Sequence, residues 1–230
     1  MKKNIIIILS LIALNACVEA TLQPFPQNDV RPLDFPMKVG NEWVYDISDA
    51  DGEIIDEMKM SFSSNKELAI DSSAPDSSVN CFFYEEQYTK FRDRSAQNGE
   101  MYMKENKLYS SLNLRSHANK KEHIVLAHYP LTVGKEWHKV IFEKLPGQMP
   151  IKEVRRVTRQ FDTTFAGNTF RQCSEIEICW TYQKGPQKDE FKIGRYILSP
   201  KIGIIYEERS LDGNIIEKRS IKKYNLKNSK

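Results

Sequence analysis

One nine-residue pattern occurs twice in the chain, and it constrains the fold more than any other feature of the sequence. Residues Phe35–Trp43 (FPMKVGNEW) return as residues Tyr129–Trp137 (YPLTVGKEW), 94 positions further on. Both copies read aromatic-Pro-x-x-Val-Gly-x-Glu-Trp. An internal repeat is interpreted before any local pattern, because each copy belongs to one copy of a larger structural unit. The sequence therefore predicts two related halves of about 95 residues each.

The residues of this pattern describe a turn that leads into a strand. Proline presets φ, and the glycines Gly40 and Gly134 permit an unusual φ at the corner. Trp43 and Trp137 then begin runs that are typical of strands. We predict that each half begins with this strand and that both tryptophans are buried in the core. Nothing in the pattern is catalytic.

Residues 1–16 have the layout of a secretory signal peptide. Lys2 and Lys3 give a short positive region, and an apolar run follows from Ile5 to Leu14. A helix that crosses a bilayer needs about 20 apolar residues, so this run is too short to span a membrane. Its length is typical of the apolar core of a signal peptide.

The apolar run ends in Leu14-Asn15-Ala16-Cys17, which resembles the bacterial lipobox. This resemblance implies that Cys17 carries acyl chains such as palmitate and becomes the mature N-terminus. The alternative is an ordinary secreted protein that is cleaved nearby, in which Cys17 has no role. Residues 17–34 hold three prolines and few large apolar side chains, which predicts a flexible tether. The expected location is the bacterial cell envelope, on its periplasmic or outer-membrane face, with the protein anchored by the lipid on Cys17.

The charge balance argues against nucleic acid as a partner. The formal charge of the whole chain is +3, and removal of residues 1–16 takes away Lys2 and Lys3 and no acid, which leaves +1. A dedicated nucleic-acid binder would show a basic stripe or patch. A nearly neutral chain is compatible with a protein partner or a small ligand.

Alternation of apolar and polar residues predicts strands along most of the chain after the tether. Trp43, Tyr45 and Ile47 alternate with their neighbours as in a half-buried strand, and Asp51-Gly52 predicts a tight turn. Residues 63–80 are rich in Ser, Asp and Asn and predict a loop. Residues 151–161 also fit helical spacing, but their β-branched residues favour a strand.

These patterns predict an all-β fold: an antiparallel curved sheet, half-barrel or sandwich-like, built from two related halves. The halves form either one continuous sheet or two packed subdomains. The expected division after the signal peptide and tether is a first β-rich half, a second β-rich half and a polar tail, at residues 35–127, 128–224 and 225–230.

Two later segments carry a family resemblance. Ala166-Gly167-Asn168-Thr169-Phe170 with Cys173 is similar to an A-G-T-F…C element, and Tyr196–Ile205 is similar to a Y-x-x-P-G-x-G-x-V strand. Both elements, and P-L-x-V-G-x-x-W, occur in uncharacterised bacterial envelope lipoproteins. Asn168 and Lys201 depart from these patterns. The resemblance implies an antiparallel β domain, and it brings no catalytic residues with it.

Three cysteines remain besides Cys17, and exported proteins often pair such cysteines. Cys173 and Cys179 are six positions apart on a predicted strand, which places them about 20 Å apart and too far for a disulfide. Cys81 could reach either of them from another strand. The alternative is that all three are small buried apolar side chains.

Four histidines fall close together in the sequence and raise the question of a metal site. The spacings of His117, His123 and His128 come nearest to those of zinc ligands, and His138 follows. No H-E-x-x-H pattern accompanies them, and neighbouring lysines such as Lys120 would repel a cation. We therefore expect no metal.

The sequence contains no G-x-S-x-G nucleophile elbow and no glycine-rich phosphate loop, so we expect neither enzymatic activity nor a cofactor. The predicted function is a non-enzymatic envelope lipoprotein that acts as a binding or structural module. One alternative is a carrier of a lipid or other apolar ligand in a concave β-sheet, and a second is a hydrolase with a site built from loops. The partners considered are the membrane, an envelope protein and an apolar ligand.

Overall fold

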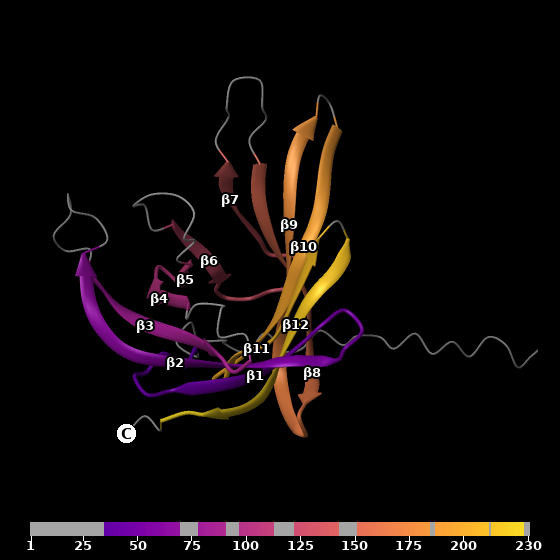
Figure 1. Cartoon of the computed structure of the whole chain (residues 1–230). Coiled ribbons are helices and arrows are strands. Elements are labelled where there is room, and N and C mark those ends of the chain that lie inside the picture. The colour runs from indigo at the N-terminus through magenta and orange to yellow at the C-terminus, as the bar shows by residue number, and fades with distance from the viewer. Residues whose placement is uncertain are drawn as a thin grey trace, which may run out of the picture.

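A computed structural model describes residues 35–69, 78–90, 97–112, 122–142, 151–184, 187–211 and 213–227. In these residues the chain is all-β and every strand pair is antiparallel, which confirms the predicted fold class (Figure 1). The same residues include no helix long and apolar enough to cross a membrane. The predicted signal peptide, tether and Cys17 lie outside the described residues.

Twelve strands are found in the described part of the chain. Their bounds are β1 Glu42–Ser48, β2 Ile54–Ala69, β3 Ser78–Tyr88, β4 Gln97–Lys104, β5 Lys107–Leu112, β6 Glu122–His128, β7 Glu136–Phe142, β8 Ile151–Phe165, β9 Asn168–Lys184, β10 Gln187–Ser199, β11 Gly203–Leu211 and β12 Asn214–Asn225.

The strands form one continuous curved sheet rather than two subdomains. Their order is β6-β5-β4-β3-β2-β1-β12-β11-β10-β9-β8-β7. The chain thus starts at the middle of the sheet, runs outward to β6, restarts at the opposite edge with β7 and returns to the middle. There β12 pairs with β1, with Glu42 opposite Asn225. The first six and the last six strands therefore occupy the two sides of the sheet (Figure 1).

The two copies of the repeated pattern adopt the same local geometry. Gly40 and Gly134 have φ values of 85° and 86°, the left-handed region that glycine enters without strain. The Gly40 amide donates to the Phe62 carbonyl at 2.9 Å, and the Gly134 amide donates to the Val157 carbonyl at 2.8 Å. Two further pairs of backbone bonds also match: Asn41 N to Lys38 O and Lys135 N to Thr132 O, then Phe62 N to Asn41 O and Val157 N to Lys135 O. Strands β1 and β7 both begin at the glutamate of the pattern.

The two tryptophans of the pattern differ in burial, although both were expected to be buried. Trp43 is 1% exposed, packs edge-on against Phe62 and donates its indole N–H to the Ile202 carbonyl at 2.6 Å. Trp137 is only half-buried. The reason lies in the topology, because β1 has a strand on each side and β7 is an edge strand. An edge strand covers only part of a side chain that a central strand would bury.

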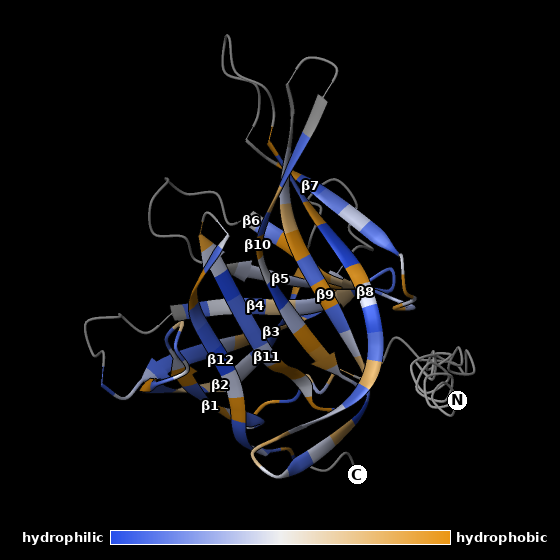
Figure 2. Cartoon of the chain, turned by 90° about the vertical axis from the view of Figure 1, so that its right-hand side faces the viewer, coloured by the Kyte–Doolittle hydropathy of each residue, from blue (hydrophilic) through white to orange (hydrophobic). Residues whose placement is uncertain are grey.

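One face of the sheet, here called the inner face, carries the main core. It includes Trp43 and Tyr45 of β1, Phe62 of β2 and Tyr84 of β3, all buried in one cluster. The opposite face is called the outer face. Figure 2 shows apolar and polar segments alternating along β8, β9 and β10, as expected for strands with one face toward a core.

The sheet curls until its two edges approach each other, and side chains of β7 bridge the gap to β6. The indole N–H of Trp137 donates to the Val125 carbonyl at 2.8 Å, and the ammonium of Lys139 donates to the His123 carbonyl at 3.2 Å. In a closed sheet, backbone amides of β7 would pair with carbonyls of β6. Here the side chains of Trp137 and Lys139 donate to two of those carbonyls instead.

Strands β2 and β3 are longer than the sequence predicted, and β8 lies where it was predicted. The loop predicted at residues 63–80 is wrong for residues 63–69 and 78–80, because β2 and β3 extend through them. Their polar side chains pair across the strands, as Asn65 and Asn80 do at 3.1 Å, so polar composition did not indicate a loop there. The strand predicted at residues 151–161 is confirmed and lies within β8.

Candidate functional site

The inner face contains a buried ion network centred on Arg219 of β12. Its Nε lies 3.1 Å from Glu217, and its Nη1 lies 3.7 Å from Glu86 and 3.4 Å from Glu207. Its Nη2 donates to the Tyr88 hydroxyl at 3.0 Å, and that hydroxyl donates to Glu86 at 3.3 Å. All three guanidinium nitrogens are therefore engaged, and side chains from β3, β11 and β12 are joined across the inner face.

Burial and the neighbouring arginines shift the pKa values of Glu86 and Glu207 in opposite directions. Burial raises the pKa of Glu86 above its usual range, although the charge of Arg219 partly offsets the effect. Burial acts in the same direction on Glu207, but the charges of Arg219 and Arg209 outweigh it and lower the pKa of Glu207. Arg209 donates to Glu207 at 3.2 Å. Glu207 is thus a fixed anion, whereas ionised Glu86 depends on Arg219.

A second inner-face group continues the network toward β6. Buried Arg155 of β8 lies 2.6 Å from Glu153 and donates to the Tyr196 hydroxyl at 3.3 Å. The Tyr196 hydroxyl donates in turn to the Leu126 carbonyl of β6. Burial raises the pKa of Tyr196 to about 12, so this hydroxyl remains a donor at neutral pH. The polar atoms of Arg155 and Tyr196 thus have partners within the protein, as those of Arg219 do. We therefore assign a structural role to the Arg219 network and to the Arg155 group.

The outer face of the first half carries a pocket of about 390 Å³. Its lining comes from β2, β3, β4 and β6: Lys66, Leu68, Ala69, Val79, Cys81, Phe83, Glu100, Tyr102 and His123. Pockets that bind small molecules occupy roughly 300–1,000 Å³. The register explains why these residues meet, because Phe83 lies opposite Glu100 and Cys81 lies opposite Tyr102.

Two polar residues of the pocket lining are buried. Glu100 is 4% exposed and Tyr102 is 5% exposed. The Tyr102 ring stacks on Tyr109, with centroids 4.9 Å apart and planes at 9°, and lies 5.3 Å from the ring of His123. Burial, followed by Tyr109, Cys81 and Glu100, raises the pKa of Tyr102 to about 12. The phenol is therefore neutral at physiological pH.

A ladder of charges crosses the outer face of the second half. Glu175 of β9 lies 2.9 Å from both Arg159 of β8 and Arg195 of β10, and Arg195 lies 3.0 Å from Glu208 of β11. Burial alone would raise the pKa of Glu175, but the bonds from Arg159 and Thr158 and the two arginine charges lower it. The ladder fixes four adjacent strands in register.

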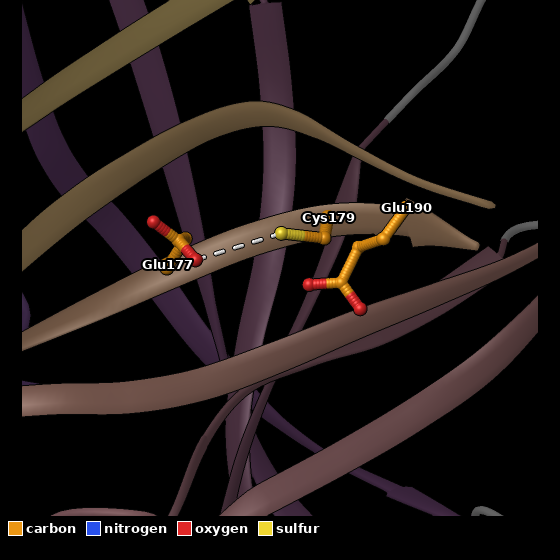
Figure 3. A group of neighbouring side chains, drawn as sticks. All are labelled: Glu177, Cys179 and Glu190. Carbon is orange, nitrogen blue, oxygen red and sulfur yellow. Dashed lines mark hydrogen bonds between the residues drawn. The ribbon is translucent and has the colours of Figure 1, made fainter. Parts of the chain in front are cut away.

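Glu177, Cys179 and Glu190 form a group whose ligand atoms lie within 4.8 Å of one another (Figure 3). Each carboxylate already has a cation: Lys192 lies 2.9 Å from Glu177, and Arg156 lies 3.4 Å from Glu190. Burial and then the two glutamates raise the pKa of the Cys179 thiol to about 12. The two cations already neutralise both carboxylates, so this group is a poor place for a further cation.

The structure separates the residues that the sequence had suggested as chemical candidates. Cys81, Cys173 and Cys179 are all buried, and no two of them form a disulfide. Burial raises the pKa of Cys173 to about 11, which makes this thiol a poor nucleophile. Cys173 and Cys179 lie on one strand, as predicted.

The histidines do not form a ligand set among the described residues, where the group around Cys179 is the only cluster with metal-ligand geometry. His123 lines the outer-face pocket, and His128 lies beside Trp137, with ring centroids 6.5 Å apart. Burial and then Lys135 and Lys107 lower the pKa of His128. His138 is exposed on β7, and His117 lies outside the described residues.

Sequence reasoning missed both the ion network and the pocket. The network had a readable signal: Glu86 stands in the alternating run Phe82, Tyr84, Glu86, Tyr88, where an inward position holds a charge. A charge on an apolar face predicts a buried partner. The pocket had no such signal, because its residues come from four strands whose register the sequence does not specify.

No protein-family model and no curated protein matches the chain. Two solved structures do. One, from Parabacteroides distasonis, is described as a "putative lipoprotein"; it aligns over 83% of this chain and 97% of its own, with 15% identity and a TM-score of 0.53. The other, from Bacteroides fragilis, is described as a "putative exported protein with YmcC-like fold"; it covers 83% and 98% of the two chains, with 9% identity and a TM-score of 0.48. The first likeness shows a shared fold.

Proposed function

We propose that this chain is a lipid-anchored protein of the bacterial cell envelope that binds a small ligand and catalyses no reaction. The observation that carries the proposal is the outer-face pocket of about 390 Å³, with the buried residues Glu100 and Tyr102 in its lining. Buried polar groups that converge on a concave site are typical of ligand recognition. The lipobox-like residues that end at Cys17 support the envelope location, and so does the P. distasonis structure that shares the fold and is described as a "putative lipoprotein".

The inner face is less suited to carrying cargo. The apolar part of the inner face is filled by Trp43, Phe62 and their neighbours, and its charged part is occupied by the Arg219 network. A carrier that held an apolar ligand there would have to displace paired buried ions, which is costly. The outer-face pocket needs no such displacement.

The absence of catalysis is proposed from the state of the candidate groups. The thiols of Cys173 and Cys179 have pKa values near 11 and 12 and remain protonated at neutral pH. An activated cysteine shows the opposite shift, because the thiolate is the nucleophile. A ligand that binds to this protein should therefore be released chemically unchanged.

Native mass spectrometry of the protein, extracted gently from its own envelope, tests this function. We expect a bound mass on the wild-type protein, released on denaturation and unchanged after long incubation. Val79→Trp, which places a large ring on the pocket wall, should lack that mass. Ile216→Trp is the matched control, since Ile216 is exposed on β12, outside the pocket. A wild-type protein that never carries a ligand, or one that converts its ligand, would contradict the proposal.

A further inference from the structure

The position of Phe35 decides which end of the sheet lies nearest to Cys17 along the chain. Phe35 is buried against the turn between β10 and β11, since a Cβ added to Gly203 would lie 3.2 Å from its ring. The amide of Lys227, after β12, donates to the Asn41 side chain at 2.7 Å. The start of β1, the end of β12 and the β10–β11 turn therefore lie together at one end of the sheet, here called the entry end.

The length of the predicted tether favours the entry end as the one that faces the membrane. A flexible chain with the 18 residues of segment 17–34 has a root-mean-square end-to-end distance of about 20–25 Å. Strand β10 has 13 residues and leads away from the entry end for about 43 Å (Figure 1). A lipid on Cys17 would therefore hold the entry end, rather than the β9–β10 hairpin, next to the membrane surface.

Three exposed lysines and two exposed side chains with apolar surface lie at the entry end. They are Lys201, Lys223, Lys227, Val39 and Tyr224, here called the entry patch. Lys227 lies over Gly40, beside Val39, because a Cβ added to Gly40 would be 3.3 Å from the Lys227 Cε. Lys201 precedes Ile202, whose carbonyl accepts the Trp43 indole N–H at 2.6 Å, and Tyr224 lies opposite Trp43 in the sheet. The patch thus surrounds the start of β1.

Nearby acids leave the positive charge of the entry patch in place. Within the described residues, none of its three lysines is paired with a carboxylate. Glu42, at the start of β1, is instead paired with Lys59 at 2.6 Å. By contrast, Lys222 lies 3.1 Å from Asp46 and 2.9 Å from Glu57. Lysines are attracted to anionic headgroups, and tyrosine rings favour the headgroup level of a membrane, so the composition of the patch matches an anionic lipid surface.

We propose that the entry patch docks the domain on a lipid surface with anionic headgroups. The inference rests on the lipid anchor of the proposed function and goes beyond it, because it names the part of the domain that faces the membrane and the lipid charge that this part selects. The anchor keeps the chain at the membrane, and the patch sets the orientation of the domain. The outer-face pocket has no part in this docking.

Co-sedimentation with vesicles tests the inference on the mature chain, with Cys17→Ser in place of the acylated cysteine so that no acyl chain contributes. With lipid in large molar excess, we expect binding to vesicles of phosphatidylglycerol and not to vesicles of phosphatidylcholine. Binding should be lost at about 1 M salt, where the Debye length is roughly 3 Å. Equal binding to both kinds of vesicle, or binding to neither, would overturn the inference.

Charge-matched variants locate the docking surface. Each lysine near an anionic surface strengthens binding about fivefold, so Lys201→Gln/Lys227→Gln should bind phosphatidylglycerol roughly 25 times more weakly than wild type. The control Lys90→Gln/Lys152→Gln removes two exposed lysines near the other ends of β3 and β8, away from the entry end, and should bind as wild type does. Equal weakening in both variants would show that net charge alone drives binding and would refute the patch, as would unchanged binding of Lys201→Gln/Lys227→Gln.

This test separates the docking from the anchor, because the lipid-free chain needs no acylation to reach a vesicle. A protein that incorporates a fatty-acid label at Cys17, but whose lipid-free form shows no preference for phosphatidylglycerol, refutes the docking and leaves the proposed function in place.

Discussion

Arg219 offers the sharpest test of how the inner face is held together. The change Arg219→Met keeps an unbranched side chain of similar length and removes the charge. It would leave Glu86, Glu207 and Glu217 near one another without the cation that lies within 3.7 Å of each. Removing one partner of a buried ion pair costs about 3–5 kcal/mol. A domain of this size has a total stability of about 5–15 kcal/mol, so the loss would be a large fraction of it.

The loss of stability in Arg219→Met should depend on pH, because Glu86 becomes neutral when it takes up a proton and then no longer needs a cation. Its pKa is already raised by burial, and the loss of Arg219 removes the charge that opposes this shift. A carboxyl group with a raised folded-state pKa favours the fold at low pH and loses that contribution as the pH rises through the folded-state pKa. The deficit of Arg219→Met should therefore be larger at pH 8 than at pH 5.

Urea unfolding followed by tryptophan fluorescence measures the effect, since Trp43 is fully buried and should report loss of the core. The matched control is Arg209→Met. Arg209 is 44% exposed and pairs only with Glu207 in this network, so its loss should cost about 1 kcal/mol or less. The reasoning is refuted if Arg219→Met lies within 1 kcal/mol of wild type at pH 8, or if the two variants are equally stable.

Four further predictions concern other parts of the chain. Metabolic labelling with a fatty-acid analogue should mark the wild-type protein and not Cys17→Ser, and equal labelling of both would end the lipoprotein proposal. Gly99→Ala should destabilise the fold by roughly 1–3 kcal/mol in thermal melts, because the added Cβ would lie 2.2 Å from the Tyr84 ring, and an unchanged midpoint would refute this close approach. The advantage of wild type over Glu175→Gln should shrink as the pH falls below about 4.3, because the lowered pKa of Glu175 gives a stability that is lost through protonation; a constant difference between pH 7 and pH 3 would contradict it. Restoring zinc, calcium or magnesium to chelator-treated protein should leave the unfolding midpoint unchanged, whereas a saturable rise would reveal a metal site, since a ligand at 100 times its Kd adds about 2.7 kcal/mol.

The strands and their directions could be predicted largely from the sequence, because alternation and turn residues are local signals. The alternation of Trp43, Tyr45 and Ile47 with their neighbours indicates β1, and Gly40 indicates the turn before it. The burial of Trp137 could not be predicted, since it depends on whether a strand lies beside β7. The length of β2 was underestimated, because its polar residues are paired by β3 rather than by water.

The candidate site was harder to predict than the fold. Glu100 and His123 are separated along the chain, and they face one pocket only because β4, β5 and β6 place Glu100, Ser111 and His123 in one cross-strand row. Register is a property of the assembled sheet, and a shift of one residue would turn every side chain of a strand to the opposite face. A single sequence gives no independent measure of it.

The meeting of β1 and β12 at the middle of the sheet has a consequence for how this domain can be rewired. The amide of Lys227 donates to the Asn41 side chain at 2.7 Å, so the two ends of the folded domain are neighbours. A circular permutant that joins these ends and opens the chain between β6 and β7 would run through the sheet in spatial order, each strand beside its sequence neighbours. Among the strand pairs of the described residues, β1–β12 is the one that joins strands distant in the native chain, and the permutant would make it local. Low contact order favours fast folding, so the permutant should reach the same sheet sooner than the natural chain does.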